Sequence, residues 1–142
     1  VAILLWIAVL AVLSLAACTP KEPEVVEVTL TDFGVESSVT TFKVGQPYEF
    51  VITNTGALNH EFVIMRPLEE DEIEAPASEH GAGGHSMDDA LLTIGEDDLP
   101  PGAVVTANYT FRRTADAGEL ELACHIAGHY TAGMHIPITV ER

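Results

Sequence analysis

The sequence predicts an all-β domain of the sandwich class, and three observations support this prediction. Short stretches of alternating or β-branched and aromatic residues recur from residue 25 onward, turn residues separate them, and no long helical period interrupts them. A chain of 142 residues has room for one such domain and not for two. We expect strands over residues 25–31, 38–44, 47–53, 60–65, 90–94, 104–112, 119–124 and 135–140.

Each expected strand has a local reason. Residues 25–31 and 38–44 alternate between apolar and polar side chains, as a strand with one buried face does. Residues 47–53 and 60–65 are rich in β-branched and aromatic residues, and the later stretches continue the series. Turn signals separate the strands at Gly45-Gln46-Pro47, Asn54-Thr55-Gly56, Pro100-Pro101-Gly102 and Ala117-Gly118. Residues 66–89 break the pattern, because they are acidic and rich in Gly and Ala, and we expect a flexible loop there.

The N-terminal stretch has the composition of an export signal. Residues 1–17 are apolar apart from Ser14, carry no charge, and are followed after Cys18 by the polar run TPKEPE. The residues LAAC, which end at Cys18, resemble the lipobox of bacterial lipoproteins, in which the cysteine is acylated and becomes the first mature residue. We therefore expect a lipoprotein signal peptide over 1–17, a lipidated linker over 18–24 and the globular domain over 25–142.

Two other interpretations of residues 1–17 stay open. The stretch can remain as a transmembrane anchor, although it is slightly shorter than the roughly 20 apolar residues of a spanning helix, or it can be an ordinary cleaved signal. No basic residue precedes the apolar run, so we expect the natural chain to start further upstream. All three interpretations place the domain outside the cytoplasm. The lipobox places it on a bacterial membrane, facing the periplasm or the cell exterior.

The chain is strongly acidic. It carries 6 Lys and Arg residues against 22 Asp and Glu residues, and its formal net charge is −16 at pH 7. Such a surface repels nucleic acid and anionic lipid and favours cationic partners. The alternative is that the acidity serves only solubility.

The two cysteines, Cys18 and Cys124, are informative because the protein is expected to be exported. Two cysteines in an exported protein often form a disulfide. If Cys18 carries a lipid, however, Cys124 is left as a lone thiol in an oxidising compartment. A metal ion is the usual partner of such a thiol.

Candidate metal ligands follow Cys124 at equal spacing. The run CHIAGHYTAGM supplies the thiolate of Cys124, the imidazole of His129 and the thioether of Met134, with four residues between each successive pair. Copper that cycles between Cu(I) and Cu(II) favours this mixture, because thiolate and thioether suit Cu(I) and imidazole serves both states. A trigonal site needs a second imidazole, and His60, at the head of a strand after an Asn-Thr-Gly turn, is the best candidate.

Three motifs resemble the cupredoxin family of blue copper proteins, which includes plastocyanin, azurin, auracyanin and rusticyanin. They are F-x-V-G-x-x-Y-x-F-x-I-x-N-T-G from Phe42, N-H-E-F from Asn59, and the closing C-x4-H-x4-M. The ligand spacing most resembles auracyanin and rusticyanin, and CHIAGHYTAGM with HEF is similar to periplasmic cupredoxins associated with copper tolerance. The resemblance covers residues 25–142 and implies an eight-stranded Greek-key sandwich with one copper ion among the loops at one end. It also implies His60, Cys124 and His129 as equatorial ligands and Met134 as a weak axial ligand.

Each candidate ligand also has an ordinary structural interpretation. Cys124 can be a small buried hydrophobic residue, His60 a strand residue, His129 a loop residue and Met134 part of the core. The four together, at this spacing in an exported β domain, favour a metal site. Zinc fits this donor set less well, because it prefers four strong ligands and seldom binds a thioether.

Two neighbours of the ligands have expected roles as well. His125 follows Cys124 at a strand end and points the opposite way, so we do not expect it to bind the same ion. By resemblance, Asn59 forms a hydrogen bond near Cys124 and His125 that makes the site rigid. Alternatively, His125 lies on an electron path leading from the thiolate, or it is a half-exposed histidine without a role.

The loop over 66–89 contains three more residues that can bind copper, His80, His85 and Met87. One hypothesis is an auxiliary, weaker copper site that captures or hands over the ion. The alternative is a polar loop that happens to contain histidines, because Gly-rich segments rarely have a preformed binding geometry.

The function that these features predict is one-electron transfer by a monomeric blue copper protein. Its partner would be a cytochrome or another copper protein, which the acidic surface would steer toward it. The alternative is a periplasmic copper-binding protein for copper resistance or trafficking, because one fold serves both roles. An enzyme is less expected, since copper enzymes built on this fold need a second domain or further ligands, and nothing marks an oxyanion hole for Cys–His hydrolysis.

Overall fold

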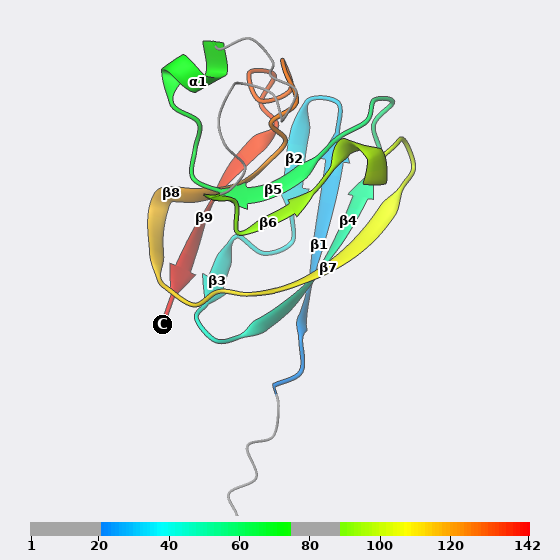
Figure 1. Cartoon of the computed structure of the whole chain (residues 1–142). Helices are drawn as coiled ribbons and strands as arrows, with labels where there is room; N and C mark the ends of the chain where they lie inside the picture. The colour runs from blue at the N-terminus through cyan, green and yellow to red at the C-terminus, as the bar shows by residue number, and fades with distance from the viewer. Residues whose placement is uncertain (1–20, 75–88) are drawn as a thin grey trace, which may run out of the picture.

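In the computed structural model, the described residues, 21–74 and 89–142, form a sandwich of two β-sheets (Figure 1). One sheet has the strand order β2-β1-β4-β7, and the other has the order β3-β9-β8-β5-β6. The strands are β1 (Glu24–Thr31), β2 (Gly34–Ser37), β3 (Thr41–Lys43), β4 (Pro47–Asn54), β5 (Phe62–Met65), β6 (Leu92–Ile94), β7 (Val104–Thr110), β8 (Ala115–Ala123) and β9 (His135–Glu141). The predicted all-β sandwich is confirmed.

The structure differs from the expected strand list mainly at β2. This strand pairs antiparallel with β1 through a hairpin in which Thr31 lies opposite Gly34, so Asp32 and Phe33 form a two-residue turn. Gly34 is the first residue of this strand, although glycine in a sequence usually indicates a turn or a break between strands. The described residues therefore contain nine strands in place of the eight that the family resemblance implies.

A second difference lies in β8, which begins at Ala115, ahead of the expected start at residue 119. The expected turn at Ala117-Gly118 is an irregularity within this strand, where the pairing with β9 shifts register between Ala115 and Leu120. Gly118 has a φ of 90°, which glycine adopts without strain. Gly118, which predicts a turn in the sequence, thus lies at an interruption of the pairing between β8 and β9 in the structure.

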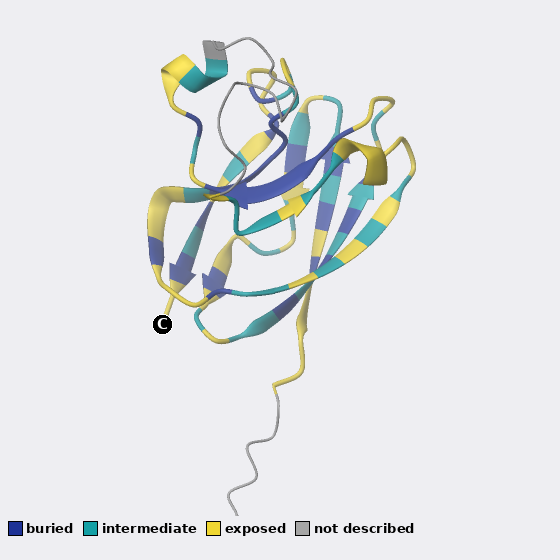
Figure 2. Cartoon of the chain, in the orientation of Figure 1, coloured by how far each residue is buried: buried dark blue, intermediate teal, exposed yellow. Residues whose placement is uncertain are grey.

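The main core lies between the two sheets. Alternate residues of β1 and β4 point inward, among them Val26, Val28, Phe50 and Ile52, which are fully or almost fully buried. This period of two is the pattern that the sequence shows over the same residues. Figure 2 shows the alternation as buried bands that are separated by intermediate or exposed ones along these strands.

Strand β5 is buried on both faces (Figure 2). Phe62 and Ile64 pack into the main core, while Val63 and Met65 join a second cluster that includes Leu68 and other residues outside the sandwich. Helix α1 (Glu70–Glu74) and the 3₁₀ helix η2 (Glu96–Asp98) lie in the connections before and after β6. None of the helices described here is long and apolar enough to cross a membrane.

The two ends of the sandwich differ, and β4 connects them. We call the end where β4 finishes, with loops 55–61 and 124–134, the site end; it is at the top of Figure 1. We call the end where β4 begins the aromatic end. The predicted loop 66–89 contains α1, and its residues 75–88 lie outside the described part of the chain.

Candidate metal centre

His60 is positioned by the loop that follows β4. Asn54, the last residue of that strand, is fully buried, and its amide nitrogen donates hydrogen bonds to the carbonyl oxygens of Leu58 and Leu99, both at 2.8 Å. Its amide oxygen accepts a hydrogen bond from the backbone N–H of Gly56 at 2.9 Å. The backbone N–H of His60 donates to the Leu99 carbonyl at 3.1 Å. The Asn-Thr-Gly motif therefore organises the turn that fixes His60.

Cys124 and His129 are positioned by loop 124–134, between β8 and β9. The loop folds back on itself, because the N–H of Cys124 donates to the carbonyl of Met134 at 2.9 Å and the N–H of Met134 donates to that of His129 at 3.1 Å. Gly128 and Gly133 have φ values of 84° and 106°, which residues with a Cβ rarely adopt. The glycines in the sequence motif are therefore needed for the tight loop.

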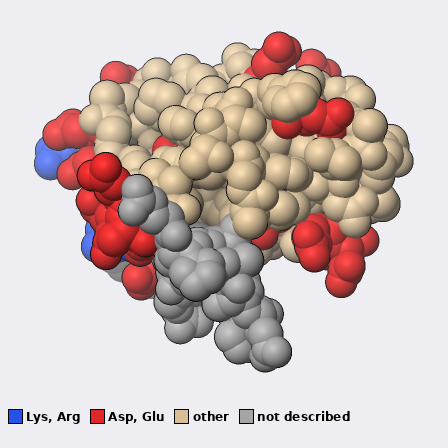
Figure 3. Space-filling view, turned by 90° about the horizontal axis from the view of Figure 1, so that it is seen from above, with Lys and Arg blue, Asp and Glu red and all other residues tan. Residues whose placement is uncertain are grey.

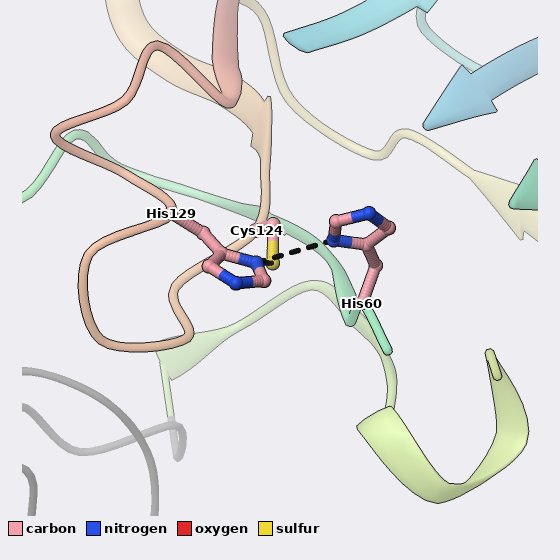
Figure 4. A group of neighbouring side chains, drawn as sticks. All are labelled: His60, Cys124 and His129. Carbon is pink, nitrogen blue, oxygen red and sulfur yellow. Dashed lines mark hydrogen bonds between the residues drawn. The ribbon is translucent and has the colours of Figure 1, made fainter. Parts of the chain in front are cut away.

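The three side chains converge at the site end (Figure 4). One potential ligand atom from each of His60, Cys124 and His129 lies within 4.8 Å of the others. The two Nδ1 atoms are 3.1 Å apart, and the Sγ of Cys124 is 3.5 Å from the Nδ1 of His129. Among the residues described, this is the only group of three or more His, Cys, Asp and Glu residues that is close enough to hold a metal ion.

Burial sets the protonation of this group. His60 and Cys124 are fully buried, whereas His129 is partly exposed. Burial raises the pKa of the Cys124 thiol to about 11, although the backbone N–H groups of Glu61 and Ile126 oppose the shift. Burial also lowers the pKa of His60, as does its neighbour His129, with Asp32 acting in the opposite direction. The site therefore offers a neutral imidazole and a thiol that loses its proton when a metal binds.

The donor set fits copper. A thiolate with two imidazole nitrogens, and no carboxylate among the three, matches the trigonal ligand set of electron-transfer copper sites. Met134 is fully buried in the core cluster that contains Cys124, and its carbonyl accepts the Cys124 N–H. This places Met134 beside the group. Its thioether as an axial ligand remains a prediction.

A buried carboxylate, Glu61, joins the two segments that carry the ligands. Its backbone N–H lies 3.5 Å from the Sγ of Cys124, and its side chain accepts a hydrogen bond from the backbone N–H of His125 at 2.8 Å. The prediction that Asn59 forms this bridging hydrogen bond was wrong. The side chain of Asn59 is exposed and forms no hydrogen bond within residues 21–74 and 89–142. The residue after His60, not the one before it, bridges the segments.

His125 lies in a different environment from the three ligands. It is buried, its Nε2 is 3.7 Å from the Oε1 of Glu121, and its ring packs edge-on against Tyr130 with centroids 5.3 Å apart. Tyr130 in turn stacks on His135 at 4.3 Å. Burial and the hydrogen bond with Glu121 raise the pKa of Tyr130 to about 12. The interpretation of His125 as a half-exposed residue was therefore wrong.

Four expected residues lie outside the described part of the chain. They are the predicted lipidation site Cys18 and the three loop residues His80, His85 and Met87. The auxiliary copper site and the lipid anchor thus remain predictions. Conversely, Glu61 and Asp32, whose carboxylates contact the site, were not predicted from the sequence. The acidic residue within N-H-E-F was the only signal for Glu61.

No protein-family model matches the chain. The copper-resistant cuproprotein CopI of Pseudomonas aeruginosa is 30% identical in an alignment that is 139 residues long. The match covers 82% of this chain and 75% of that protein.

Solved structures of auracyanin and rusticyanin have the same fold. Auracyanin from Roseiflexus castenholzii matches with a TM-score of 0.58 at 20% identity, over 84% of this chain and 98% of that one. Rusticyanin from Thiobacillus ferrooxidans matches with a TM-score of 0.53 at 18% identity, over 84% of this chain and 79% of that one. With this fold, the His60–Cys124–His129 group and the identity to a cuproprotein, the chain belongs to the cupredoxin family.

Proposed function

We propose that this protein is a mononuclear blue copper protein that carries single electrons and is not an enzyme. The observation that carries the proposal is the convergence of one buried thiol and two imidazole Nδ1 atoms at one end of a cupredoxin sandwich. Copper held there supplies one-electron chemistry, because it is stable as Cu(I) and as Cu(II) with these ligands. Met134, buried beside Cys124, is proposed as the weak axial ligand.

The protein itself holds the ligands in place and excludes water. The hydrogen bonds of Asn54, Glu61 and the Cys124–Met134 backbone pair fix both loops that carry the ligands. A fixed ligand geometry requires little rearrangement when the charge of the ion changes. His129 is the one ligand of the three with solvent exposure, so its ring edge is the natural entry point for an electron.

The test is to add Cu(II) to the purified protein and to record the visible spectrum. We expect one copper per chain and an intense thiolate-to-copper charge-transfer band, which Cys124→Ser abolishes. His60→Ala and His129→Ala should weaken binding and alter the band. The absence of the band in the unaltered protein, or its survival in Cys124→Ser, contradicts the proposal.

A second candidate function is copper resistance or trafficking, because the curated relative is a copper-resistant cuproprotein. The two functions differ in how the ion behaves. A carrier keeps its ion in both oxidation states and exchanges electrons quickly, whereas a trafficking protein releases the ion to an acceptor. Stopped-flow electron exchange with a small redox probe, compared with copper transfer to a chelator, separates them.

We further infer that the protein works outside the cytoplasm and is tethered to a bacterial membrane through Cys18. The inference rests on the apolar residues 1–17 and the LAAC sequence. Mass spectrometry of the mature N-terminus in a bacterial host tests it. An acylated Cys18 as the first residue supports it, and a mature chain that starts elsewhere contradicts it.

The partner that best fits the surface is a basic redox protein, such as a cytochrome or another copper protein. Acidic side chains far outnumber basic ones on the site end, which Figure 3 shows from above, and the net charge is −16. Opposite charge steers association, and salt screens that attraction. The rate constant of reduction by a basic cytochrome should therefore fall as ionic strength rises.

A further inference from the structure

Asp32 is brought to the site end by the hairpin between β1 and β2. It is the first of the two turn residues between Thr31 and Gly34. Its Oδ1 accepts hydrogen bonds from the backbone N–H groups of Ala57 at 2.8 Å and Leu58 at 3.1 Å. The turn thereby holds a carboxylate against loop 55–61, the loop that positions His60.

The same oxygen faces the ring of His60. The Oδ1 of Asp32 is 3.5 Å from the Nε2 of His60, and the side chain of His60 is fully buried, whereas that of Asp32 is 26% exposed. Within the described residues, this Nε2 has no hydrogen-bond partner of standard geometry. The other ring nitrogen, Nδ1, points at His129 and Cys124. An imidazole that binds a metal through Nδ1 carries its proton on Nε2, and that proton needs an acceptor.

Gly56 leaves room for this contact. A Cβ at position 56 would overlap the Oδ1 of Asp32 and would lie 2.8 Å from the Nε2 of His60. The backbone of Gly56 does not have a positive φ, so its conformation alone does not demand glycine. The requirement is one of space, at the point where the carboxylate meets the imidazole. The structure therefore gives two independent signs, the distance and the glycine, of a close approach between these side chains.

We propose that Asp32 is a positioning residue for His60. Its carboxylate accepts a hydrogen bond from the Nε2–H of His60, fixes the orientation of the ring and makes the imidazole a stronger copper ligand. This inference rests on the proposed function. A carboxylate partner makes a ligating imidazole more basic, and its negative charge favours the more highly charged metal state. Asp32 therefore stabilises Cu(II) relative to Cu(I) and lowers the reduction potential of the site.

Three variants separate this role from a structural one. Asp32→Asn keeps an amide oxygen for the N–H groups of Ala57 and Leu58 but removes the charge. Asp32→Ala removes both. Glu96→Gln is the matched control. Glu96 is exposed, and its charge raises the pKa of Cys124 after the larger effect of burial, but within the described residues no hydrogen bond or ion pair joins it to a ligand.

We expect Asp32→Asn to keep the charge-transfer band and to bind Cu(II) about tenfold more weakly. With an unchanged Cu(I) affinity, this corresponds to a potential about 59 mV higher. Asp32→Ala should shift the potential in the same direction and alter the band as well. Glu96→Gln should shift it much less, because solvent screens a charge that is exposed. Equal shifts in Asp32→Asn and Glu96→Gln, or no shift in Asp32→Asn, would overturn the proposal.

Gly56→Ala is a second route to the same contact, because it separates the two side chains without changing any charge. We expect its potential to rise as well. A potential equal to that of the unaltered protein contradicts a role for the contact.

A metal-free measurement distinguishes failure of this inference from failure of the proposed function. In copper-free protein, ¹⁵N NMR reports which ring nitrogen of His60 carries the proton. We expect Nε2–H in the unaltered protein and a shift toward Nδ1–H in Asp32→Ala. If the unaltered protein forms no blue site, the proposed function fails. If the tautomer of His60 is the same in Asp32→Ala, the role of Asp32 fails.

Discussion

The two ends of the sandwich bury different kinds of side chain. At the aromatic end, Phe42, Tyr48 and Phe111 pack together, with the ring of Phe42 4.9 Å from each of the other two by centroid. At the site end, the buried side chains include polar ones, among them His60 and Glu61. Burial of aromatic surface stabilises a fold directly, whereas a buried polar group costs free energy unless it is hydrogen-bonded.

This difference indicates that the two ends of the domain have different roles. The aromatic end supplies stability that does not depend on a ligand. The site end holds buried polar groups that are incompletely hydrogen-bonded within the described residues, such as the Nε2 of His60. Strand β4 links the two, since Tyr48 lies near its start and Asn54 at its end. The site is rigid because a stable core supports it.

The largest change in the free energy of unfolding is expected from a substitution at the aromatic end. Phe42→Ala should lower the free energy of unfolding by about 3–5 kcal/mol, because it leaves a cavity among the rings. Chemical denaturation measures this change. The control is Phe33→Ala at a side chain that is 78% exposed, which should change stability by less than about 0.5 kcal/mol. If folded Phe42→Ala loses its charge-transfer band, the two ends are not as independent as we infer.

The next effect concerns the site end and depends on copper. A ligand that binds only the folded state stabilises it by about 2.7 kcal/mol at 100 times its dissociation constant. We expect a rise of this order in the free energy of unfolding when Cu(II) is added. Cys124→Ser should cancel the rise, while Phe42→Ala should keep it. An equal rise in Cys124→Ser would mean that copper stabilises the protein from another site.

Glu61 tests the hydrogen bond that joins the ligand-bearing segments. Glu61→Ala leaves the buried N–H of His125 without its acceptor, which should cost about 1–3 kcal/mol and broaden the charge-transfer band. Glu61→Gln keeps an oxygen at that position, so it should retain most of the stability and the band. If Glu61→Gln is as damaging as Glu61→Ala, the charge of Glu61 matters and the hydrogen bond alone does not explain its role.

Much of the fold follows from the sequence because the apolar period of two is explicit in it. Residues 47–53 predict β4 almost to its ends, and the core positions Phe50 and Ile52 fall on the expected face. Strand β2 was missed because its four residues are held by pairing with β1, which no local pattern encodes. Gly118 was interpreted as a turn because glycine marks both turns and bulges.

The three ligands of the site were predictable, whereas the residues that support them were not. Cys124 and His129 lie in one short motif, so their proximity is encoded locally. Asp32 reaches His60 only because the β1–β2 hairpin folds over loop 55–61, and such a contact between distant segments leaves no spacing to recognise. Asn59 was predicted in place of Glu61 because the sequence does not show which neighbour of His60 faces the segment that contains Cys124 and His125.

The smallest change in stability is expected at the aromatic end, at the hydroxyl group of Tyr48. The hydroxyl of the buried Tyr48 accepts a hydrogen bond from the backbone N–H of Lys43 at 2.8 Å, and Tyr48→Phe should cost about 1 kcal/mol at neutral pH. Burial raises the pKa of Tyr48 above 10 in the folded state, although the Lys43 hydrogen bond opposes the shift. The unfolded chain therefore loses the phenol proton first as the pH increases.

The contribution of Tyr48 is consequently complete below pH 10 and is lost as the pH rises through the pKa of the folded state. Denaturation of both proteins across pH 8–11 should show the advantage of the unaltered protein over Tyr48→Phe shrinking above pH 10. Tyr109→Phe, at a partly exposed tyrosine beside the same cluster, is the control. A constant difference across that range would mean that Tyr48 ionises no later in the folded state than in the unfolded one. The aromatic end would then be more open to water than its packing indicates.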